Sequence, residues 1–160
     1  MRRKEREITD PAEVKEILEK AEVLRIALNN GVYPYVFPVN FGYQMQGEQM
    51  MLFFHGAQDG TKHEIIQRDP HVAFEMDCET ALIPPKGMEA CTASYAYASV
   101  IGQGIIQKAE EAEKEPLLGK LLHHYGIQTM PMNPNHLART TVYKILVEHY
   151  TAKLRKKERS

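Results

Sequence analysis

The stretch MLFFHGAQDGTK, Met51–Lys62, decides how the rest of the chain is interpreted. Its four leading apolar residues predict a short buried strand. Gly60 then permits a tight turn, and Thr61 is predicted to cap a helix, because Glu64 three residues later would complete a capping box. We therefore expect a strand, a turn of small residues and a helix N-terminus, with Lys62 in the first helical turn.

This helix start is also a candidate anion site. Unpaired backbone N–H groups, the positive end of the helix and the Lys62 ammonium all favour an anion such as phosphate. Gly56 and Ala57 just before it would leave room for a flat molecule close to the backbone. An ordinary capped helix after a core strand would use the same residues, so this stretch leaves both readings open.

Length and composition indicate one globular domain. The chain has 160 residues, of which 43% are hydrophobic and 26% charged, as in ordinary soluble proteins. The net charge of −1 provides no global attraction to nucleic acid. No apolar stretch approaches the ~20 residues of a membrane helix, and the charged N-terminus lacks the apolar region of a signal peptide. We expect one domain over residues 1–160, with a core of about 8–150 between charged tails, in the cytoplasm.

Hydrophobic periodicity predicts several short strands and a few helices. A helix begins at Asp10, with Pro11 in its first position, and another covers Glu110–Tyr125 before Gly126. No alternation of parallel strands and helices is present, so an antiparallel barrel with added helices is expected. Besides Met51–His55, the predicted strands cover Leu24–Leu28, Tyr35–Tyr43, His71–Asp77, Tyr95–Gln107 and Thr141–Tyr150.

Three local signals refine the predicted sheet. Asn30-Gly31 is typical of a hairpin turn, and Pro38 indicates an edge strand or a bulge. Gly102 and Gly104 indicate a bend or a close approach to the backbone. Alternating residues place a row of apolar, mostly aromatic side chains on one face, more than one side of a small barrel usually needs: Tyr35, Phe37, Val39, Phe41 and Tyr43. This row favours a homodimer.

Several kinds of chemistry find little support in the sequence. The histidines include no metal-binding helical pair, so no metal site is expected. Cys78 and Cys91 match no metal spacing, are too few for a disulfide scaffold, and have nothing nearby in the sequence to activate them. Neither a nucleophile-elbow serine nor a dinucleotide glycine fingerprint is present.

Three remaining stretches together resemble a known family: Pro38–Tyr43 (PVNFGY), Phe54–Lys62 (FHGAQDGTK) and Tyr97–Gly104 (YASVIGQG). In this order they resemble the FMN-binding split-barrel superfamily, the pyridoxamine 5'-phosphate oxidase-like fold, and within it the nitroimidazole-resistance family. The resemblance covers roughly Ile8 to Tyr150. It implies a mainly β (α+β) antiparallel split barrel with flanking helices and a homodimer with FMN at the subunit interface.

The resemblance also implies roles for particular residues. Lys62, with the amides of Gly60 and Thr61, would hold the flavin phosphate. His55, placed near flavin and substrate, would be the catalytic residue; a strand-end histidine bonded to a neighbouring carbonyl is the alternative. The other implied cofactor contacts come from the three motifs: Val39, Asn40 and Phe41 at the polar edge of the ring, Gly56 and Ala57 near the ring or ribityl chain, and Ser99 and Val100 as further hydrogen-bonding positions.

The sequence departs from the family patterns in two places, and these differences limit the functions to be expected. The chain has no Trp, whereas pyridoxamine-phosphate oxidase proper closes its pocket with a C-terminal tryptophan and arginine motif, so vitamin B6 oxidation is not expected. Gln103 stands where the resistance family more often has an aromatic. We expect an FMN-dependent oxidoreductase that reduces a small oxidised substrate, for example a nitro compound. The alternatives are a non-catalytic flavin- or haem-binding split barrel and a dimeric interaction module.

Overall fold

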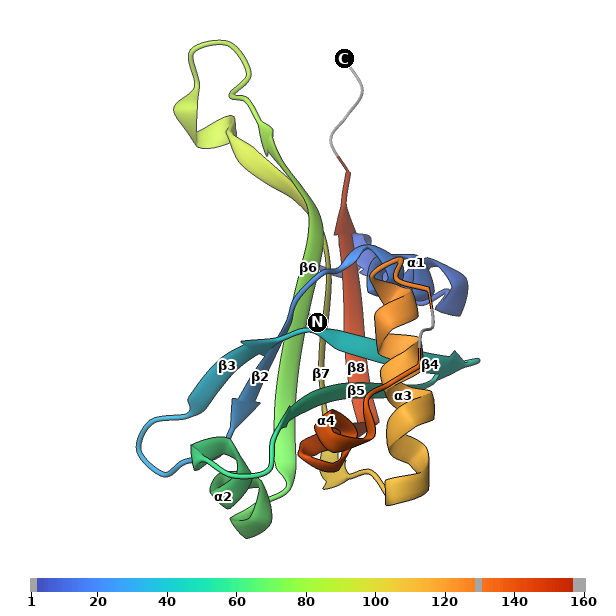
Figure 1. Ribbon diagram of the computed structural model, residues 1–160. Coiled ribbons are helices and arrows are strands. Elements are labelled where there is room, and N and C mark those ends of the chain that lie inside the picture. The colour runs from blue at the N-terminus through green and yellow to red at the C-terminus, as the bar shows by residue number, and fades with distance from the viewer. Residues whose placement is uncertain (1–2, 129–130, 157–160) are drawn as a thin grey trace.

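The computed structural model describes residues 3–128 and 131–156, whose strands form one antiparallel sheet (Figure 1). The strands follow the order β3-β2-β6-β7-β8-β5-β4, and β1 pairs with β8. Their bounds are β1 Glu7–Ile8, β2 Leu24–Leu28, β3 Tyr35–Val39, β4 Phe41–Gln46, β5 Gln49–Ala57, β6 His71–Ile83, β7 Ser94–Lys108 and β8 Thr140–Arg155. The helices are α1 Pro11–Lys20, α2 Thr61–Arg68, α3 Glu111–His124 and α4 Pro134–Ala138, with 3-10 turns at Lys4–Arg6 and Ala90–Thr92.

The two edge strands of this sheet are joined by one residue, Asn40. Strand β3 pairs with β2 and β4 pairs with β5, so the chain passes from one edge of the sheet to the other at Asn40. This passage closes the sheet into a barrel that is split at that residue. The predicted antiparallel split barrel with flanking helices is therefore confirmed. Pro38 lies in edge strand β3, as its missing N–H group requires.

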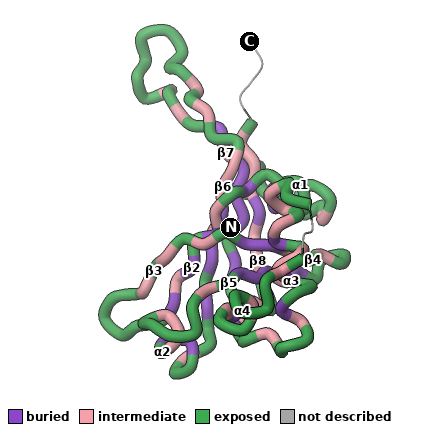
Figure 2. Tube along the Cα trace, viewed as in Figure 1, coloured by how far each residue is buried: buried purple, intermediate pink, exposed green. Residues whose placement is uncertain are grey.

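Apolar side chains pack on both faces of the barrel wall. The larger cluster fills the interior, and the strands that carry it run through the centre of Figure 2. The smaller cluster lies on the outer face, where Phe53 and Val142 pack against Leu117 and Leu121 of α3. Alternation along β5 sends Phe53 outward and Phe54 inward, so both are buried. Helix α3 thus covers the wall on one side and leaves the neighbouring face open.

Most predicted strands are longer in the structure. Strands β6 and β7 continue beyond the barrel as a two-stranded arm whose exposed tip comprises residues 84–93 (Figures 1 and 2). Gly102 and Gly104 are explained by close contacts, because a Cβ at Gly102 would meet the Phe74 ring and one at Gly104 would meet the Leu146 carbonyl. The register shift in β7 also falls at Gln103/Gly104, so the predicted bend and close approach are confirmed.

The apolar row of β3 and β4 is not an exposed face. Phe41 is fully buried, while Tyr35, Phe37, Val39 and Tyr43 are half-buried and pack against the barrel interior. These residues therefore pack against the core of one chain, and the dimer that the row suggested stays a prediction. Exposed apolar side chains lie elsewhere, including Tyr95 and Ile101 of β7 and Leu146 of β8, with 57%, 50% and 43% exposure.

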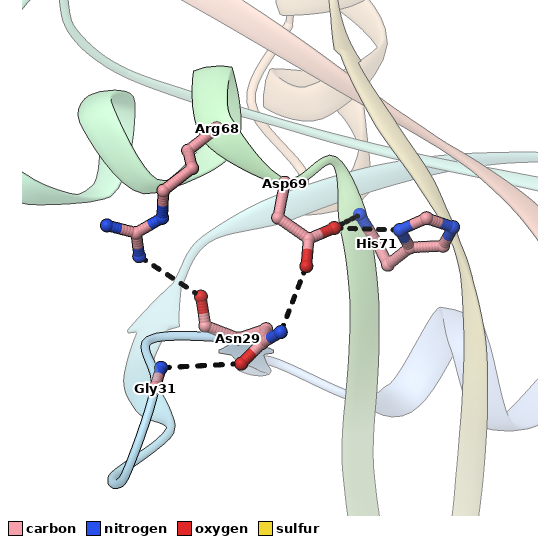
Figure 3. Close-up of polar contacts among 5 residues, drawn as sticks. All are labelled: Asn29, Gly31, Arg68, Asp69 and His71. Atoms are coloured by element: carbon pink, nitrogen blue, oxygen red, sulfur yellow. Dashed lines mark hydrogen bonds and ion pairs between the residues drawn. The ribbon is translucent and has the colours of Figure 1, made fainter.

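The β2–β3 hairpin is tied to the end of α2 (Figure 3). Its connection, residues 29–34, contains the predicted Asn30-Gly31 turn, with Gly31 at φ +74°. The Asn29 side chain accepts from the Gly31 N–H at 3.4 Å and donates to Asp69 at 3.0 Å. Asp69 also accepts from the His71 N–H at 3.1 Å and is paired with the His71 ring at 2.7 Å. These bonds fix the hairpin beside the helix that carries Lys62.

Candidate functional site

The predicted anion site lies where β5 ends and α2 begins. Gly60 occupies the N-cap position with φ +106°, a left-handed conformation suited to glycine. The predicted capping box is wrong: Thr61 is the first helical residue, and no side chain caps the helix. The Gly60 carbonyl accepts from the His63 and Glu64 N–H groups at 2.9 and 3.3 Å. The N–H groups of Thr61 and Lys62 have no intrahelical acceptor and donate no hydrogen bond within the described part of the chain, so both are available to a ligand.

The Lys62 side chain folds back over the end of β5. A Cβ added at Gly56 would stand 2.5 Å from the Lys62 Nζ, and that Nζ lies 5.8 Å from the centroid of the Phe37 ring. The space at Gly56 that the sequence assigned to a flat ligand is thus filled by the lysine itself. Within residues 3–128 and 131–156 Lys62 forms no ion pair, so its charge is not neutralised by a carboxylate.

His55 is exposed on the outer face of β5, opposite Val142 of β8. The surrounding atoms remove part of the ring's hydration, and the Lys62 charge adds to this effect, so the pKa of His55 is lowered from its usual value of 6.5. The ring does not enter a packed layer. An exposed imidazole with a lowered pKa can accept or supply a proton near neutral pH. Ala57, two residues further along β5, is also exposed.

The split between β3 and β4 places Val39, Asn40 and Phe41 at the edge of the barrel. Asn40 is exposed there, and Val39 is half-buried. The Phe41 N–H group is already used, because it donates to the Tyr125 hydroxyl at 3.0 Å, which in turn donates to the Glu22 carbonyl at 2.7 Å. Of the three residues, Asn40 is thus the one whose side chain stands open to a ligand.

Ser99 and Val100 lie far along the sheet from His55. In the pairing of β8 with its neighbours, Ser99 stands opposite Lys153 and His55 stands opposite Val142. Those two β8 residues are eleven positions apart, which corresponds to roughly 35 Å along an extended strand. Val100 has no exposed surface, so its side chain belongs to the core. One copy of the chain does not bring Ser99 beside Lys62.

Sequence analysis missed three residues that shape this region. His63 is hydrogen-bonded to Tyr143 at 2.8 Å, and Tyr125 fixes the split at Phe41. His63 follows Lys62 directly, which was a signal for its position. Tyr143 and Tyr125 carried no signal, because they lie 80 and 84 residues away in sequence from His63 and Phe41, the residues they contact here. Such contacts depend on the closed barrel.

A metal ion or a cofactor cavity near His55 would need suitable side chains or space among the described residues. No group of three or more His, Cys, Asp or Glu side chains is placed to hold a metal within residues 3–128 and 131–156. A cavity of about 630 Å³ lies at the β4–β5 hairpin, lined by residues such as Gln44, Met50 and Leu146, and its lining includes neither His55 nor Lys62. In the same described ranges, no helix has the length and apolar character needed to cross a bilayer.

Several solved protein structures share this fold. A candidate 5-nitroimidazole antibiotic resistance protein from Bacteroides thetaiotaomicron is 23% identical, with a TM-score of 0.77, over 92% of this chain and 85% of that one. The FAD- and heme-binding protein from Mycobacterium smegmatis has 16% identity and a TM-score of 0.80, over 94% and 74%. The flavocytochrome Anf3 from Azotobacter vinelandii has 16% identity and a TM-score of 0.78, over 98% and 72%.

Sequence comparison gives the family. A search of curated proteins found no match. The sequence model of the pyridoxamine 5'-phosphate oxidase family matches residues 10–154. This range is nearly the whole chain and contains all three motifs. The superfamily resemblance inferred from those motifs is thereby confirmed. The chain belongs to the pyridoxamine 5'-phosphate oxidase family.

Proposed function

We propose that the protein is an FMN-dependent oxidoreductase that reduces a small oxidised substrate such as a 5-nitroimidazole. The observation that carries this proposal is Lys62, a lysine without a carboxylate partner in the described structure, at the uncapped start of α2 beside an exposed histidine. Family membership and the flavin-binding neighbours support it. The name of the nitroimidazole resistance neighbour supports the substrate class.

The phosphate of FMN fits the start of α2. The free Thr61 and Lys62 N–H groups and the positive helix end favour an anion, and the Lys62 ammonium adds a full charge. Lys62 now rests on Gly56 and the Phe37 ring. A lysine held by such a weak contact can turn toward a phosphate at low cost, since a cation over an aromatic ring contributes only about 0.5–1 kcal/mol at exposed sites.

The flavin ring would lie between the end of β5 and the barrel split. Asn40 offers a side-chain amide to its polar edge, and the Gly56–Ala57 backbone offers a surface without bulky side chains. FMN would supply the redox chemistry, as cofactors generally do, while the protein supplies position and electrostatics. His55 would hold a proton on an imidazole nitrogen and deliver it to the substrate, because reduction of a nitro group consumes protons.

A second copy of the chain would complete the site. Ser99 of β7 pairs with Lys153, eleven positions along β8 from Val142, the partner of His55, so within one chain it does not reach the cofactor proposed beside His55 and Lys62. In a homodimer, Ser99 and the Val100 backbone of one protomer would meet Lys62 and His55 of its partner. The exposed Ile101 of β7 and Leu146 of β8 supply apolar surface for such an interface. We therefore propose a homodimer with flavin at the subunit interface.

The visible spectrum and a reoxidation assay test this function. The purified protein should be yellow, with the two flavin maxima, and release FMN on denaturation. After anaerobic reduction, added 5-nitroimidazole should reoxidise the bound flavin much faster than it reoxidises free FMN. Flavin maxima without fast reoxidation would favour the non-catalytic flavin-binding alternative. An intense Soret band after haem addition would favour the haem-binding alternative, which the neighbours from Mycobacterium and Azotobacter suggest.

A further inference from the structure

The first turn of α2 is attached to a buried tyrosine of the barrel wall. The Nδ1 atom of His63 and the hydroxyl of Tyr143 are hydrogen-bonded at 2.8 Å, and Tyr143 has no exposed surface. The Nε2 atom on the other side of the His63 ring contacts the Gln67 amide at 2.9 Å and the Lys108 ammonium at 3.5 Å. Both ring nitrogens are engaged, so the ring has a fixed orientation.

This attachment substitutes for a cap. Gly60 offers no side chain to the helix start, and the buried residues of α2, Ile65 and Ile66, lie in its next turn. Burial of those two residues holds the helix on the barrel but leaves its first turn free to tilt. The bond from His63 to Tyr143 is what connects that first turn to a buried side chain. Since His63 directly follows Lys62, it also sets where the Thr61 and Lys62 N–H groups point.

The same tyrosine lies at one end of a row of rings that ends under Lys62. Tyr143 stacks on Phe54 with centroids 5.2 Å apart and planes at 21°, and Phe54 meets Phe37 edge-on at 6.1 Å. The Lys62 Nζ lies 5.8 Å from the Phe37 centroid. The backbone of the first turn, through His63, and the Lys62 ammonium, through Phe37, are therefore both placed relative to Tyr143.

We infer that Tyr143, acting through His63, is a positioning residue for phosphate binding at the start of α2. This inference rests on the proposed function, and it goes further by assigning cofactor affinity to a buried side chain that touches no part of the cofactor. The tyrosine aligns the free amides and Lys62 before the phosphate arrives, which lowers the conformational cost of binding. Its effect is therefore confined to ligands that carry the phosphate.

Removing the Tyr143 hydroxyl tests whether its effect is limited to ligands that carry the phosphate. One neutral hydrogen bond changes an equilibrium by about two- to tenfold. Tyr143→Phe should therefore raise the Kd for FMN, measured by quenching of flavin fluorescence, about two- to tenfold, and leave the Kd for riboflavin, which lacks the phosphate, unchanged. Tyr150→Phe is the matched control, because Tyr150 is a half-buried tyrosine of the same strand whose hydroxyl has no hydrogen bond in the described structure.

A second variant tests whether the two residues act together. His63→Ala removes the same bond from the surface side, so it should weaken FMN at least as much as Tyr143→Phe and spare riboflavin. The double variant should match His63→Ala alone, because coupled residues do not give independent effects. Three outcomes would each overturn the inference. The effects of the two substitutions could multiply in the double variant, the losses for FMN and riboflavin could be equal, or both single variants could keep the FMN affinity of wild type.

The proposed function is tested separately by the wild-type protein. If wild type binds FMN no more tightly than riboflavin, the phosphate site itself is wrong and the positioning role is overturned with it. If wild type prefers FMN and the variants keep that preference undiminished, the phosphate site stands and only the role of Tyr143 and His63 is overturned.

Discussion

At the scale of single residues, the pair Gly56 and Lys62 carries the chemistry of the site. Gly56 is small because the lysine side chain crosses it, and the lysine is left without a carboxylate partner in the described part of the chain. A charged hydrogen bond to a phosphate contributes about 1.5–3 kcal/mol. The affinity for FMN should accordingly depend on this lysine more than on any neutral group around it.

Lys62→Ala should weaken FMN binding about ten- to a hundredfold, because it removes the charge and leaves the fold intact. Flavin content after purification and the Kd from fluorescence quenching measure the change. Lys120→Ala, an exposed lysine of α3, is the control and should bind FMN like wild type. A Lys62→Ala protein with full flavin content would rule out this phosphate site.

Gly56→Ala should displace the Lys62 ammonium without unfolding the protein. The added methyl group meets only the far end of a flexible side chain, which can move. We expect an unchanged midpoint of thermal unfolding in the absence of ligand and a several-fold higher Kd for FMN. A Kd equal to that of wild type would mean that no part of the flavin lies against Gly56.

His55→Ala should keep the flavin and slow substrate reduction about a hundredfold, a typical contribution of general acid catalysis. A general acid is active in its protonated form. Since the pKa of His55 is lowered below 6.5, the wild-type rate should fall as the pH rises, with a midpoint below 6.5. The variant should lose this dependence. Stopped-flow reoxidation between pH 5 and 8 would show it, and a variant as fast as wild type would make His55 structural.

At the scale of elements, helix α2 is fixed at both ends by polar contacts to different strands. His63 holds its start to β8, and Asp69 holds the residues after its end to Asn29 and His71 (Figure 3). The sequence predicted a helix starting in this stretch, and α2 covers Thr61–Arg68, because turn and helix signals are local. It assigned the start to a Thr61 cap, because the pattern Thr-x-x-Glu cannot reveal that the barrel itself anchors the first turn.

Protonation of Asp69 at low pH should lower the free energy of unfolding. Hydrogen bonds from the His71 ring and N–H and from Asn29 lower the pKa of Asp69 from 3.8 to about 2. The ionised carboxyl therefore stabilises the fold fully above pH 3.8, and this contribution disappears as the pH falls through about 2. Urea unfolding of wild type and Asp69→Asn should differ at pH 6 and converge near pH 2.

Asp59→Asn is the matched control, since the Asp59 side chain is exposed and has no hydrogen bond or ion pair in the described structure. It should follow wild type at every pH. A constant difference between Asp69→Asn and wild type from pH 6 to pH 2 would show that the charge of Asp69 is not what ties the hairpin to α2.

At the scale of the whole molecule, the strand pattern predicted the barrel and the motifs predicted its superfamily, because alternation and turn chemistry are local. The arrangement of the site was not accessible in the same way. The motif around Ser99 belongs to the same family pattern as the other two motifs. In the folded chain, however, Ser99 pairs near the C-terminal end of β8, whereas His55 pairs near its N-terminal end. The aromatic row of β3 and β4 suggested a dimer surface, yet barrel closure at Asn40 turns it onto the core.

In the proposed homodimer, each flavin is bound by two copies of the chain. Sedimentation should give a dimer at micromolar concentration with flavin bound. A flavin-bound monomer would contradict the shared site. In the proposed dimer, Lys62 and Ser99 of the same chain would contact two different flavin molecules.

The most direct test combines two defective chains in one dimer. Lys62→Ala removes the proposed phosphate ligand, and Ser99→Tyr puts a bulky ring at a largely buried position of β7; each homodimer should retain much less flavin than wild type. A heterodimer with one chain of each kind, purified through two different affinity tags, contains one site with both residues intact and one with both changed. The account predicts one FMN per heterodimer. If Lys62 and Ser99 served the same flavin within one chain, every site would carry one defect, and a heterodimer without flavin would contradict the account.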